Sequence, residues 1–498
     1  MVRLIKKGVY YMDGRIVKES QAFFTSDKKE RAEKNTLAYA VLKAHNLGDE
    51  ENLRLKFDAI VSHDITYVGI IQTAKASGLK EFPIPYTLTN CHNSLCAVGG
   101  TINEDDHVFG LSAAKKYGGD YVPAHLAVIH QYMRECAAGC GAMILGSDSH
   151  TRYGALGTLA VGEGGPELVK QLLKQTYDVR RPEIVAVYLR GKLRKGVGPQ
   201  DVALALVKAT FASGFVKNKI LEFIGPGIAN LSMDYRIGID VMTTETTCLS
   251  SIWETDEKTR EYFREHGREE DYREMKVAQP AYYDGAVTID LSRVEPMIAL
   301  PFHPSNAYTI REFLANPVEI LKKAEEQGRK IKGDDSFTLT DKVKDGKVYV
   351  TQGIIAGCAG GGYENVAEAA EILRGKSVGT GEFALSVYPA SQPVYKALTD
   401  AGYTGVLMEA GAVVKTAFCG PCFGAGDVPA NNGLSVRHTT RNFENREGSK
   451  PAQGQLAAVA LMDARSIAAT AANGGILTSA LDREYNRRIK KYKYDGKI

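Results

Sequence analysis

Short apolar runs alternate with amphipathic stretches in the first part of the chain, and this alternation restricts the fold more than any other feature. Phe57–Ser62, Met143–Gly146 and Ile184–Leu189 predict buried strands. Ala124–Cys136 and Gly165–Gln175 predict helices, the first with apolar residues at helical spacing. Strands that alternate with helices indicate an α/β layered fold.

The length of 498 residues exceeds one ordinary domain and suggests about three. We predict a first α/β unit at residues 1–186, a second at 187–286 and a third at 287–485. The second contains a predicted helix at Pro199–Ala212 and a very polar helix at Asp256–Met275. The third alternates predicted strands and helices, which are Val287–Leu291, Lys347–Ile355, Glu364–Arg374, Phe383–Val387 and Val394–Ala401.

Composition and charge exclude several classes of protein. Hydrophobic residues make up 44% of the chain and charged residues 24%, the balance of a globular protein with a large core. The net charge of +3 is nearly neutral, and the one dense basic cluster, Arg483–Lys493, is more typical of a solvated tail or linker than of a nucleic-acid-binding arm. No apolar run is long enough to span a bilayer. We therefore expect a soluble cytoplasmic protein, with neither membrane nor nucleic acid as its partner.

Cysteines and glycines gather in two segments of the third unit. Cys358 lies at the tip of a glycine-rich turn within Gly353–Tyr363 (GIIAGCAGGGY). Cys419 and Cys422 form a C-x-x-C pair within Phe418–Gly426 (FCGPCFGAG). In a long chain without an export signal, such thiols are expected to be reduced and available as metal ligands. Five further cysteines are Cys91, Cys96, Cys136, Cys140 and Cys248.

A C-x-x-C pair alone is compatible with half of a zinc site, a redox pair or two packed core cysteines. A structural zinc site needs four ligands, and the nearest second pair is Cys136-x3-Cys140. A redox pair would open a helix, whereas Gly424, Gly426 and Pro429 favour a loop. Three loop cysteines also suit an iron–sulfur cubane in which one iron has no thiolate and acts as a Lewis acid. Spacing alone leaves these alternatives open.

Further motifs favour one of these four interpretations of the cysteines. Gly146–Thr151 (GSDSHT) precedes a glycine-rich stretch, Arg437–Glu447 (RHTTRNFENRE) follows the C-x-x-C pair, and Gly474 and Gly475 follow an alanine-rich stretch. In this order, between residues 57 and 478, these segments and the three cysteines resemble the aconitase superfamily, which includes aconitase, homoaconitase, isopropylmalate isomerase and less characterised hydratases. The resemblance is greater to the hydratase branch than to true aconitase.

The resemblance implies three α/β domains packed around a [4Fe–4S] cluster, with Cys358, Cys419 and Cys422 as its ligands. It also implies a hydro-lyase that dehydrates or hydrates a small hydroxy di- or tricarboxylic acid, with or without isomerisation. The other five cysteines match no ligand of the family, and we predict that they are buried structural thiols.

Asp148 and His150 occupy positions where the family places an Asp–His pair beside the cluster. Dehydration needs a proton for the departing hydroxyl, and an imidazole oriented by a carboxylate can deliver it. The alternative is that Ser147 or Asp148 only caps a following helix. We favour the catalytic interpretation, because these polar residues follow a predicted strand, where open α/β sheets bind ligands.

Three more residues are implied to be catalytic. His92 matches a family histidine involved in proton delivery, although Cys91 replaces the aspartate expected before it. His130 matches another active-site histidine, and a satisfied core histidine is the alternative. Glu222 matches an acidic residue of the second domain, where its apolar neighbours suggest that it is held in place.

Arg441 and Arg446 match family arginines that bind substrate carboxylates, for which the guanidinium group is well suited. Ion pairs with neighbouring glutamates are the alternative. Ser149, within GSDSHT, and His63, at the position of a substrate-contacting glutamine of aconitase, are the other two predicted substrate contacts.

Aconitases carry a fourth, swivelling domain with a serine–arginine motif, S-S-R, which is absent from this sequence. The resemblance therefore implies either a separate small swivel-domain subunit as partner or a truncated chain, with residues 486–498 as a linker towards that domain. Two rival hypotheses are a cluster-bearing regulatory or RNA-binding relative without turnover, and a structural zinc or redox protein built on the C-x-x-C pair.

Overall fold

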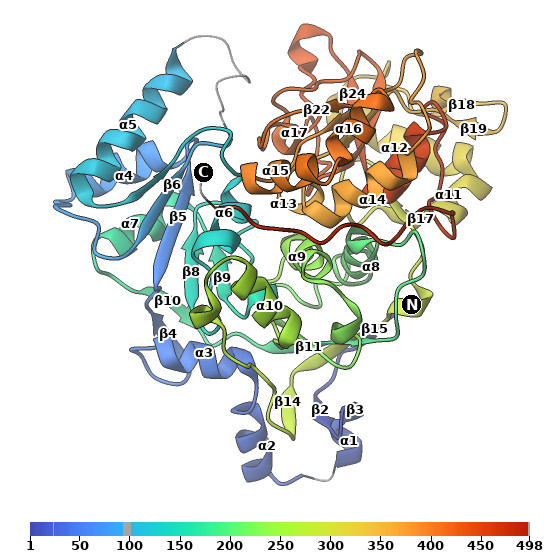
Figure 1. Cartoon of the computed structure of the whole chain (residues 1–498). Helices are drawn as coiled ribbons and strands as arrows, with labels where there is room; N and C mark the ends of the chain where they lie inside the picture. Colours follow the sequence, from blue (N-terminus) through green and yellow to red (C-terminus); the bar gives the residue numbers. More distant parts are fainter. Residues whose placement is uncertain (23, 93–100, 497–498) are drawn as a thin grey trace.

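The computed structural model describes residues 1–22, 24–92 and 101–496 and shows an α/β protein with three large sheets (Figure 1). The first sheet, blue to teal, lies on the left of Figure 1, and the third, orange to red, lies at the upper right. The predicted fold class, α/β, is confirmed. Within the described ranges, no helix is both long and apolar enough to cross a membrane.

The first sheet has five parallel strands in the order β7-β6-β5-β8-β9. All four residues of β8 are buried, as expected for a parallel strand covered on both faces. The helix α4 contacts both α5 and α7. The elements are β5 (Ala59–His63), α4 (Tyr67–Ala76), β6 (Tyr86–Thr89), α5 (Ile102–Tyr117), β7 (Asp120–Val122), α6 (Ile129–Cys136), β8 (Met143–Gly146), β9 (Leu159–Gly162) and α7 (Gly165–Leu172).

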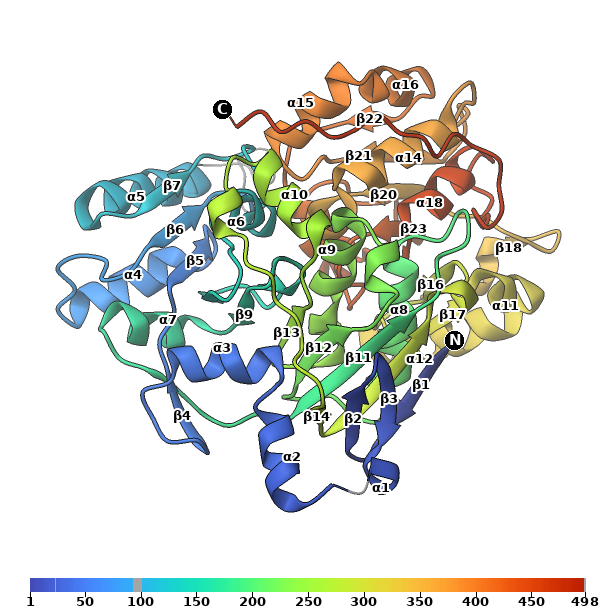
Figure 2. The ribbon, with the colours of Figure 1, turned by 60° about the horizontal axis from the view of Figure 1, so that its bottom comes forward.

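The second sheet has the order β1-β15-β11-β12-β13 and is parallel except for β1 (Figure 2). Both β1 and β15 pair within it, although β1 lies in the range predicted for the first domain and β15 crosses the boundary predicted at residue 286. The boundaries at residues 186 and 286 stay predictions. The elements are β1 (Val2–Ile5), β11 (Ile184–Arg190), α8 (Pro199–Thr210), β12 (Ile220–Ile224), α9 (Met233–Val241), η3 (Met242–Thr246), β13 (Ser250–Trp253), α10 (Glu257–Glu265) and β15 (Gly285–Asp290).

The third sheet has seven strands in the order β17-β16-β24-β23-β20-β21-β22, with five parallel strands from β24 to β22. The central strands β23 and β24 are buried along their whole length. The elements are β16 (Met297–Ala299), β17 (Ala307–Thr309), α11 (Ile310–Ala315), α12 (Pro317–Lys332), β20 (Gln352–Ile355), α13 (Gly357–Gly360), α14 (Tyr363–Leu373), β21 (Ala384–Val387), α15 (Gln392–Asp400), α16 (Tyr403–Glu409), β22 (Val413–Val414), α17 (Gly420–Phe423), β23 (Gly433–His438), β24 (Ala457–Met462) and α18 (Ala464–Ala471).

Three small sheets complete the fold, with the orders β14-β2-β3, β10-β4 and β18-β19. Their elements and the helices of the N-terminal segment are β2 (Val9–Met12), β3 (Arg15–Lys18), α1 (Glu19–Ala22), α2 (Ser26–Glu33), α3 (Leu37–His45), β4 (Asn52–Leu55), β10 (Tyr177–Arg180), β14 (Ala281–Tyr283), β18 (Val343–Lys344) and β19 (Lys347–Val348).

Two predicted helices are much shorter than expected, by five residues or more. The helix predicted at Ala124–Cys136 begins only at Ile129, because His125 has a φ of +65° and interrupts a regular helix. The helix predicted at Asp256–Met275 ends at Glu265, shortly before a glycine with a φ of +69°. In both cases the apolar and charged pattern continues beyond the point where the backbone turns.

The backbone of the C-terminal segment is docked on the protein. The Lys490 N–H donates to Tyr403 Oη at 2.9 Å, and Tyr363 Oη donates to the Lys490 carbonyl at 3.0 Å. In Figure 1 this segment crosses the molecule as a dark red trace between the helices α9 and α14. The backbone of Arg483–Lys493 is thus packed on the protein, whereas most of its basic side chains are exposed, as predicted. The linker role of residues 486–498 stays a prediction.

One hydrophobic cluster contains residues of all three large sheets, among them Val61 of β5, Val187 of β11 and Val459 of β24. Cys358 and Cys419 belong to the same cluster. The sheets therefore meet in a shared core, and the predicted ligand cysteines lie at the junction.

Candidate functional site

A cavity of about 670 Å³ lies at the carboxyl ends of parallel strands. His63 is the last residue of β5, His92 follows β6, and Asp148 follows β8. Loops at the carboxyl ends of parallel strands converge, which is why open α/β sheets bind ligands there. The predicted catalytic residues of the first sheet therefore share one opening.

The third sheet completes this cavity. Cys358 lies in α13 directly after β20, Cys419 and Cys422 lie at α17 after β22, and Arg441 and Arg446 follow β23. The structure thus brings together all but one of the predicted site residues, which are His63, His92, His130, Asp148, Ser149, His150, Cys358, Cys419, Cys422, Arg441 and Arg446.

The three predicted ligand thiols line one cavity. A Cβ on Gly357 would lie 2.7 Å from Cys422 Sγ, and the φ of +71° at Gly357 also favours glycine. The Cys422 N–H donates to the Cys419 carbonyl at 2.9 Å. The C-x-x-C pair therefore forms a helical turn, α17, instead of the predicted loop, and its two thiols line the same cavity.

Cys91 is a fourth thiol near the site, but it does not line the cavity. Its Sγ lies 3.9 Å from Cys419 Sγ and 3.4 Å from His92 Nδ1, and it accepts a hydrogen bond from the Ile129 N–H at 3.3 Å. Among the remaining cysteines, Cys140 and Cys248 are buried as predicted, Cys136 is exposed, contrary to the prediction, and Cys96 lies outside the described residues.

Four histidines surround the carboxylate of Asp148. His130 Nε2 lies 3.2 Å from Oδ1, and His150 Nδ1 lies 3.4 Å from the same oxygen. His92 Nε2 and His63 Nε2 lie 3.3 Å and 3.7 Å from Oδ2. The rings of His63 and His92 stack with their centroids 3.8 Å apart. A carboxylate in this position can orient several imidazoles for proton transfer.

The environment gives these groups different charges. Burial opposes ionisation of Asp148, but the surrounding histidines outweigh it and hold the pKa well below its usual range. Burial lowers the pKa of His63 to about 3 and that of His130 to about 4. Burial also disfavours the charged form of His92, yet the neighbouring Cys91 and Asp148 raise its pKa to about 10. At neutral pH, His92 is therefore a positively charged imidazolium, while His63 and His130 are neutral.

Glu245, which the sequence analysis missed, links the histidines to an arginine. Its Oε1 lies 2.6 Å from His150 Nε2 and accepts a hydrogen bond from Arg441 Nε at 2.8 Å. Burial opposes its ionisation, but His150 and Arg441 lower its pKa below the usual value. A polar run that follows an apolar helix, Met242–Thr247 (MTTETT), is the only signal in the sequence that pointed to this position.

The two predicted substrate arginines differ in their partners. Arg441 is paired with Glu245, whereas Arg446 forms no ion pair with any residue that the structure describes. Burial lowers the pKa of Arg446, and Arg441 lowers it further. The predicted alternative, in which the neighbouring glutamates neutralise both arginines, is not observed. Arg446 is therefore available to a ligand carboxylate.

Comparison with known proteins identifies the family. The model of the aconitase family (aconitate hydratase) matches residues 39–469. The chain belongs to the aconitase family. The family predicted from motif order is thereby confirmed, and so is the predicted class of enzyme, a hydro-lyase.

Relatives in the aconitase family are named as dehydratase subunits. The large subunit of 3-isopropylmalate dehydratase from Moorella thermoacetica is 29% identical over 87% of this chain and 96% of its own length. The large subunit 2 of 3-isopropylmalate dehydratase from Archaeoglobus fulgidus is 32% identical over 73% of this chain and 80% of its own. The large subunit of 2,3-dimethylmalate dehydratase from Eubacterium barkeri is 32% identical over 66% and 70%.

Glu222 is the predicted catalytic residue that does not line the cavity of this aconitase-family chain. Its carboxylate accepts hydrogen bonds from the N–H groups of Leu37 and Ala38, at 3.1 Å and 2.9 Å, and from Tyr283 Oη at 2.7 Å. It is fully buried and joins α3 to the second sheet. We therefore leave Glu222 out of the candidate site and assign it a structural contact.

We expect Glu222 to make the free energy of unfolding depend on pH. Burial raises its pKa from 4.5 to about 7, so the folded chain holds a proton that the unfolded chain releases between these values. The stability from this proton is complete below pH 4.5 and is lost as the pH rises through 7. Glu222→Gln should remove a decrease of about 2.5 kcal/mol in the free energy of unfolding between pH 5 and 8. Urea unfolding at both pH values measures it, and an unchanged pH dependence would contradict the assignment.

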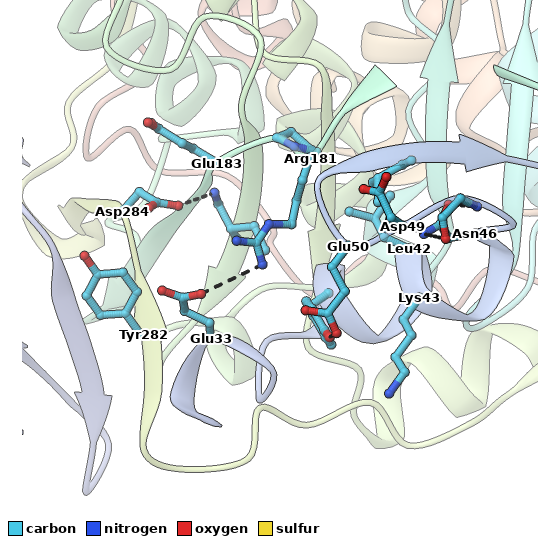
Figure 3. A pocket seen from close by; sticks show the side chains of 15 residues that line it. Glu33, Leu42, Lys43, Asn46, Asp49, Glu50, Arg181, Glu183, Tyr282 and Asp284 are labelled. Carbon is cyan, nitrogen blue, oxygen red and sulfur yellow. Dashed lines mark hydrogen bonds and ion pairs between the residues drawn. The ribbon is translucent and has the colours of Figure 1, made fainter. Parts of the chain in front are cut away.

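A second cavity, of about 440 Å³, shares no lining residue with the first. Figure 3 shows Arg181 extending towards Glu33 in this cavity, at 3.8 Å, with Glu50 and Asp284 nearby. Its described lining contains no cysteine and no histidine. It therefore lacks the groups that dehydration chemistry needs, and the first cavity is the candidate active site.

A buried pair behind His92 was not predicted from the sequence. Asp64 Oδ1 accepts a hydrogen bond from the His92 N–H at 3.0 Å, and Asp64 Oδ2 lies 3.0 Å from His107 Nε2. Asp64 follows His63 directly at the end of β5, so its position after a predicted strand was a usable signal. The pair fixes the backbone that carries His92 at the cavity.

Proposed function

We propose that this chain is the large, cluster-binding subunit of a dehydratase that acts on a substituted malate or a similar small hydroxy-carboxylic acid. One observation carries the proposal: a single cavity is lined by three thiols, a carboxylate surrounded by histidines, and two arginines. Lewis-acid, proton-transfer and carboxylate-binding groups are the three components that dehydration of a hydroxy acid needs.

The residues present fit a [4Fe–4S] cluster held by Cys358, Cys419 and Cys422. The three thiols are the cysteines that line the cavity within the described residues, and thiolates are the usual ligands of such clusters. A buried guanidinium nitrogen, Arg134 Nη2, has no described hydrogen-bond partner, and this arginine donates to the Cys358 carbonyl. An anionic group at the thiols would give this buried charge a counterpart.

When bound, the cluster would supply an iron without a protein ligand that acts as a Lewis acid on the substrate hydroxyl. The protein residues would supply the protons. His92 is protonated at neutral pH and lies 3.3 Å from Asp148, so we assign it the role of donor to the departing hydroxyl. Asp148 stays ionised and orients the neutral His130 and the linked His150. Asp148 and the histidines around it would thus hold the proton that His92 donates at the cavity.

Arg441 and Arg446 would bind the carboxylates of the substrate. Glu245 holds Arg441 through its Nε, which leaves the terminal nitrogens of the guanidinium group free to bind a carboxylate. Ile65 and Phe423 also line the cavity and would contact an alkyl substituent. Ser149 and His63 complete the proposed substrate contacts. The names of the relatives, isopropylmalate and dimethylmalate dehydratases, support an alkyl-substituted malate.

A small swivel-domain subunit is the proposed partner. The relatives named above are large subunits, which supports a second chain that would supply the remaining catalytic groups. These relatives give no support to an RNA-binding protein without turnover. A cytoplasmic location stays a prediction.

The test is anaerobic purification followed by iron and sulfide analysis and a substrate screen. We expect a coloured protein with about equal iron and sulfide, in keeping with a [4Fe–4S] cluster. Turnover of substituted malates should appear as absorbance of the unsaturated acid when a small dehydratase subunit is added. A colourless protein whose metal content does not respond to Cys358→Ser would refute the proposal.

We expect Arg446→Gln to lower kcat/KM for a substituted malate by about 10- to 100-fold, because a hydrogen bond to a charged group contributes roughly 1.5–3 kcal/mol. Steady-state kinetics measure the effect, and iron content should stay unchanged. Arg311→Gln is the matched control, because Arg311 is exposed and paired with Glu295. Equal kcat/KM in the variant and in the original protein would remove Arg446 from the substrate site.

A further inference from the structure

Five arginines are almost completely buried in the described part of the chain. Burial of a guanidinium group costs several kcal/mol unless a negative charge compensates it. The exposed fractions are 1% for Arg134, 3% for Arg152, and 0% for Arg236, Arg437 and Arg465. Each of these side chains therefore needs a partner.

Only two of the five have a carboxylate partner within the described residues. Arg236 Nη2 donates to Asp256 at 2.6 Å. Arg465 donates to Glu368 at 2.8 Å and to Asp463 at 2.9 Å. The other three form hydrogen bonds but no ion pair with a described carboxylate, and they are Arg134, Arg152 and Arg437.

Arg134 lies directly behind one ligand cysteine. It belongs to α6, and its Nη1 donates to the carbonyl of Cys358 at 3.2 Å. Its Nη2 is buried and has no hydrogen-bond partner among the described residues. Arg134 does not line the cavity, so its charge acts on Cys358 from within the protein interior.

Arg437 lies behind the other two ligand cysteines. It belongs to β23, and its Nη1 donates at 2.7 Å to the carbonyl of Pro421, between Cys419 and Cys422. Its other nitrogens donate to neutral acceptors, which are Ser435 Oγ, Gln352 Oε1 and the Asp427 carbonyl. Arg437 does not line the cavity either. Two buried guanidinium groups that form no ion pair with a described carboxylate thus donate to the two cysteine-bearing turns.

Arg152 does not share this arrangement. It donates to the carbonyls of Thr151 and Cys248, both at 2.9 Å, and forms no hydrogen bond with either cysteine-bearing turn in the described part of the chain. It is therefore not part of the inference.

We infer that Arg134 and Arg437 are the buried counter-charges of the proposed iron–sulfur cluster and raise its reduction potential. The inference rests on the proposed function, because it needs a cluster on the three thiols. Thiolate ligands leave a [4Fe–4S] cluster with net negative charge, and reduction adds one more electron. Positive charge nearby stabilises the reduced form more than the oxidised form, and protein charge and hydrogen bonding set the potentials of such clusters.

The first test is a redox titration of the anaerobically loaded protein, followed by electron paramagnetic resonance. We expect Arg134→Gln and Arg437→Gln each to lower the reduction potential, so that the ratio of oxidised to reduced cluster at a fixed potential rises about tenfold, or ~59 mV for one electron. Arg134→Lys keeps the charge and should keep most of the potential. Arg181→Gln is the control, because Arg181 is paired with Glu33 in the second cavity (Figure 3).

The second test separates a counter-charge from a structural residue. Without the cluster, Arg134 is a buried charge that forms no ion pair with a carboxylate of the described residues, so Arg134→Met should leave the Tm of the cluster-free protein unchanged or raise it. The increase in Tm on cluster loading should become smaller.

Failure of the cluster-free Arg134→Met protein to fold would overturn the inference, and so would unchanged potentials in both glutamine variants. An original protein that binds no iron at all would instead refute the proposed function.

Discussion

Cys358→Ser is expected to abolish iron binding and to lower dehydratase activity by about 10³-fold or more, because Lewis-acid stabilisation is worth several kcal/mol. Cys358 follows β20 in the short helix α13, where Gly357 lets it approach Cys422. Serine has a similar volume, but its hard oxygen replaces the soft thiolate that such clusters require. Iron and sulfide analysis, visible absorbance and turnover measure the result.

Cys91→Ser is the matched control for this experiment. Cys91 lies 3.9 Å from Cys419 Sγ but does not line the cavity, so we expect its serine variant to keep the iron and sulfide of the original protein. Loss of iron from both variants would mean that four thiols enclose the metal. A closed set of ligands leaves no position for the substrate, and the proposed chemistry would then be wrong.

Asp148→Asn is expected to lower kcat by about 10²- to 10⁴-fold, the usual contribution of general acid–base catalysis. The carboxylate lies within 3.7 Å of four imidazoles and stays ionised in this buried site. An amide of the same size keeps the volume but removes the charge that supports a protonated His92. Single-turnover kinetics with a substituted malate measure the loss.

Iron content and a distant aspartate serve as controls for the Asp148 variant. Asp148 is not a proposed ligand, so Asp148→Asn should bind as much iron as the original protein. Asp178→Asn changes an exposed aspartate of β10 and should leave kcat unchanged. If kcat of Asp148→Asn falls less than about tenfold, the histidines act without this carboxylate and the proton network is wrong.

Much of the fold could be predicted from local sequence patterns. The buried run Met143–Gly146 was predicted as a strand, and its bounds agree with β8. Because GSDSHT follows this run, the sequence placed Asp148 at a strand end, where the structure has it. The ends of helices were harder to predict. His125 and Gly267 interrupt the helical backbone through their positive φ values, while the amphipathic pattern of the sequence continues past them.

Contacts between distant segments could not be predicted from the sequence. Nothing local indicates that Glu245 bonds both His150 and Arg441, because the three residues meet only where the second sheet packs against the other two. Glu222 has apolar neighbours that suggested a held catalytic group, but those neighbours place it in the second sheet against α3.

By itself, the sequence determined the α/β class, the family and most residues of the site, because short motifs and apolar periodicity are properties of neighbouring residues. Tertiary structure alone decided which groups touch: the four histidines on Asp148, the exclusion of Glu222 and the two arginines behind the cysteine turns. The physical reason is that ion pairs and burial depend on how the sheets pack against one another. That packing joins residues hundreds of positions apart, and the spacing of residues along the chain does not predict it.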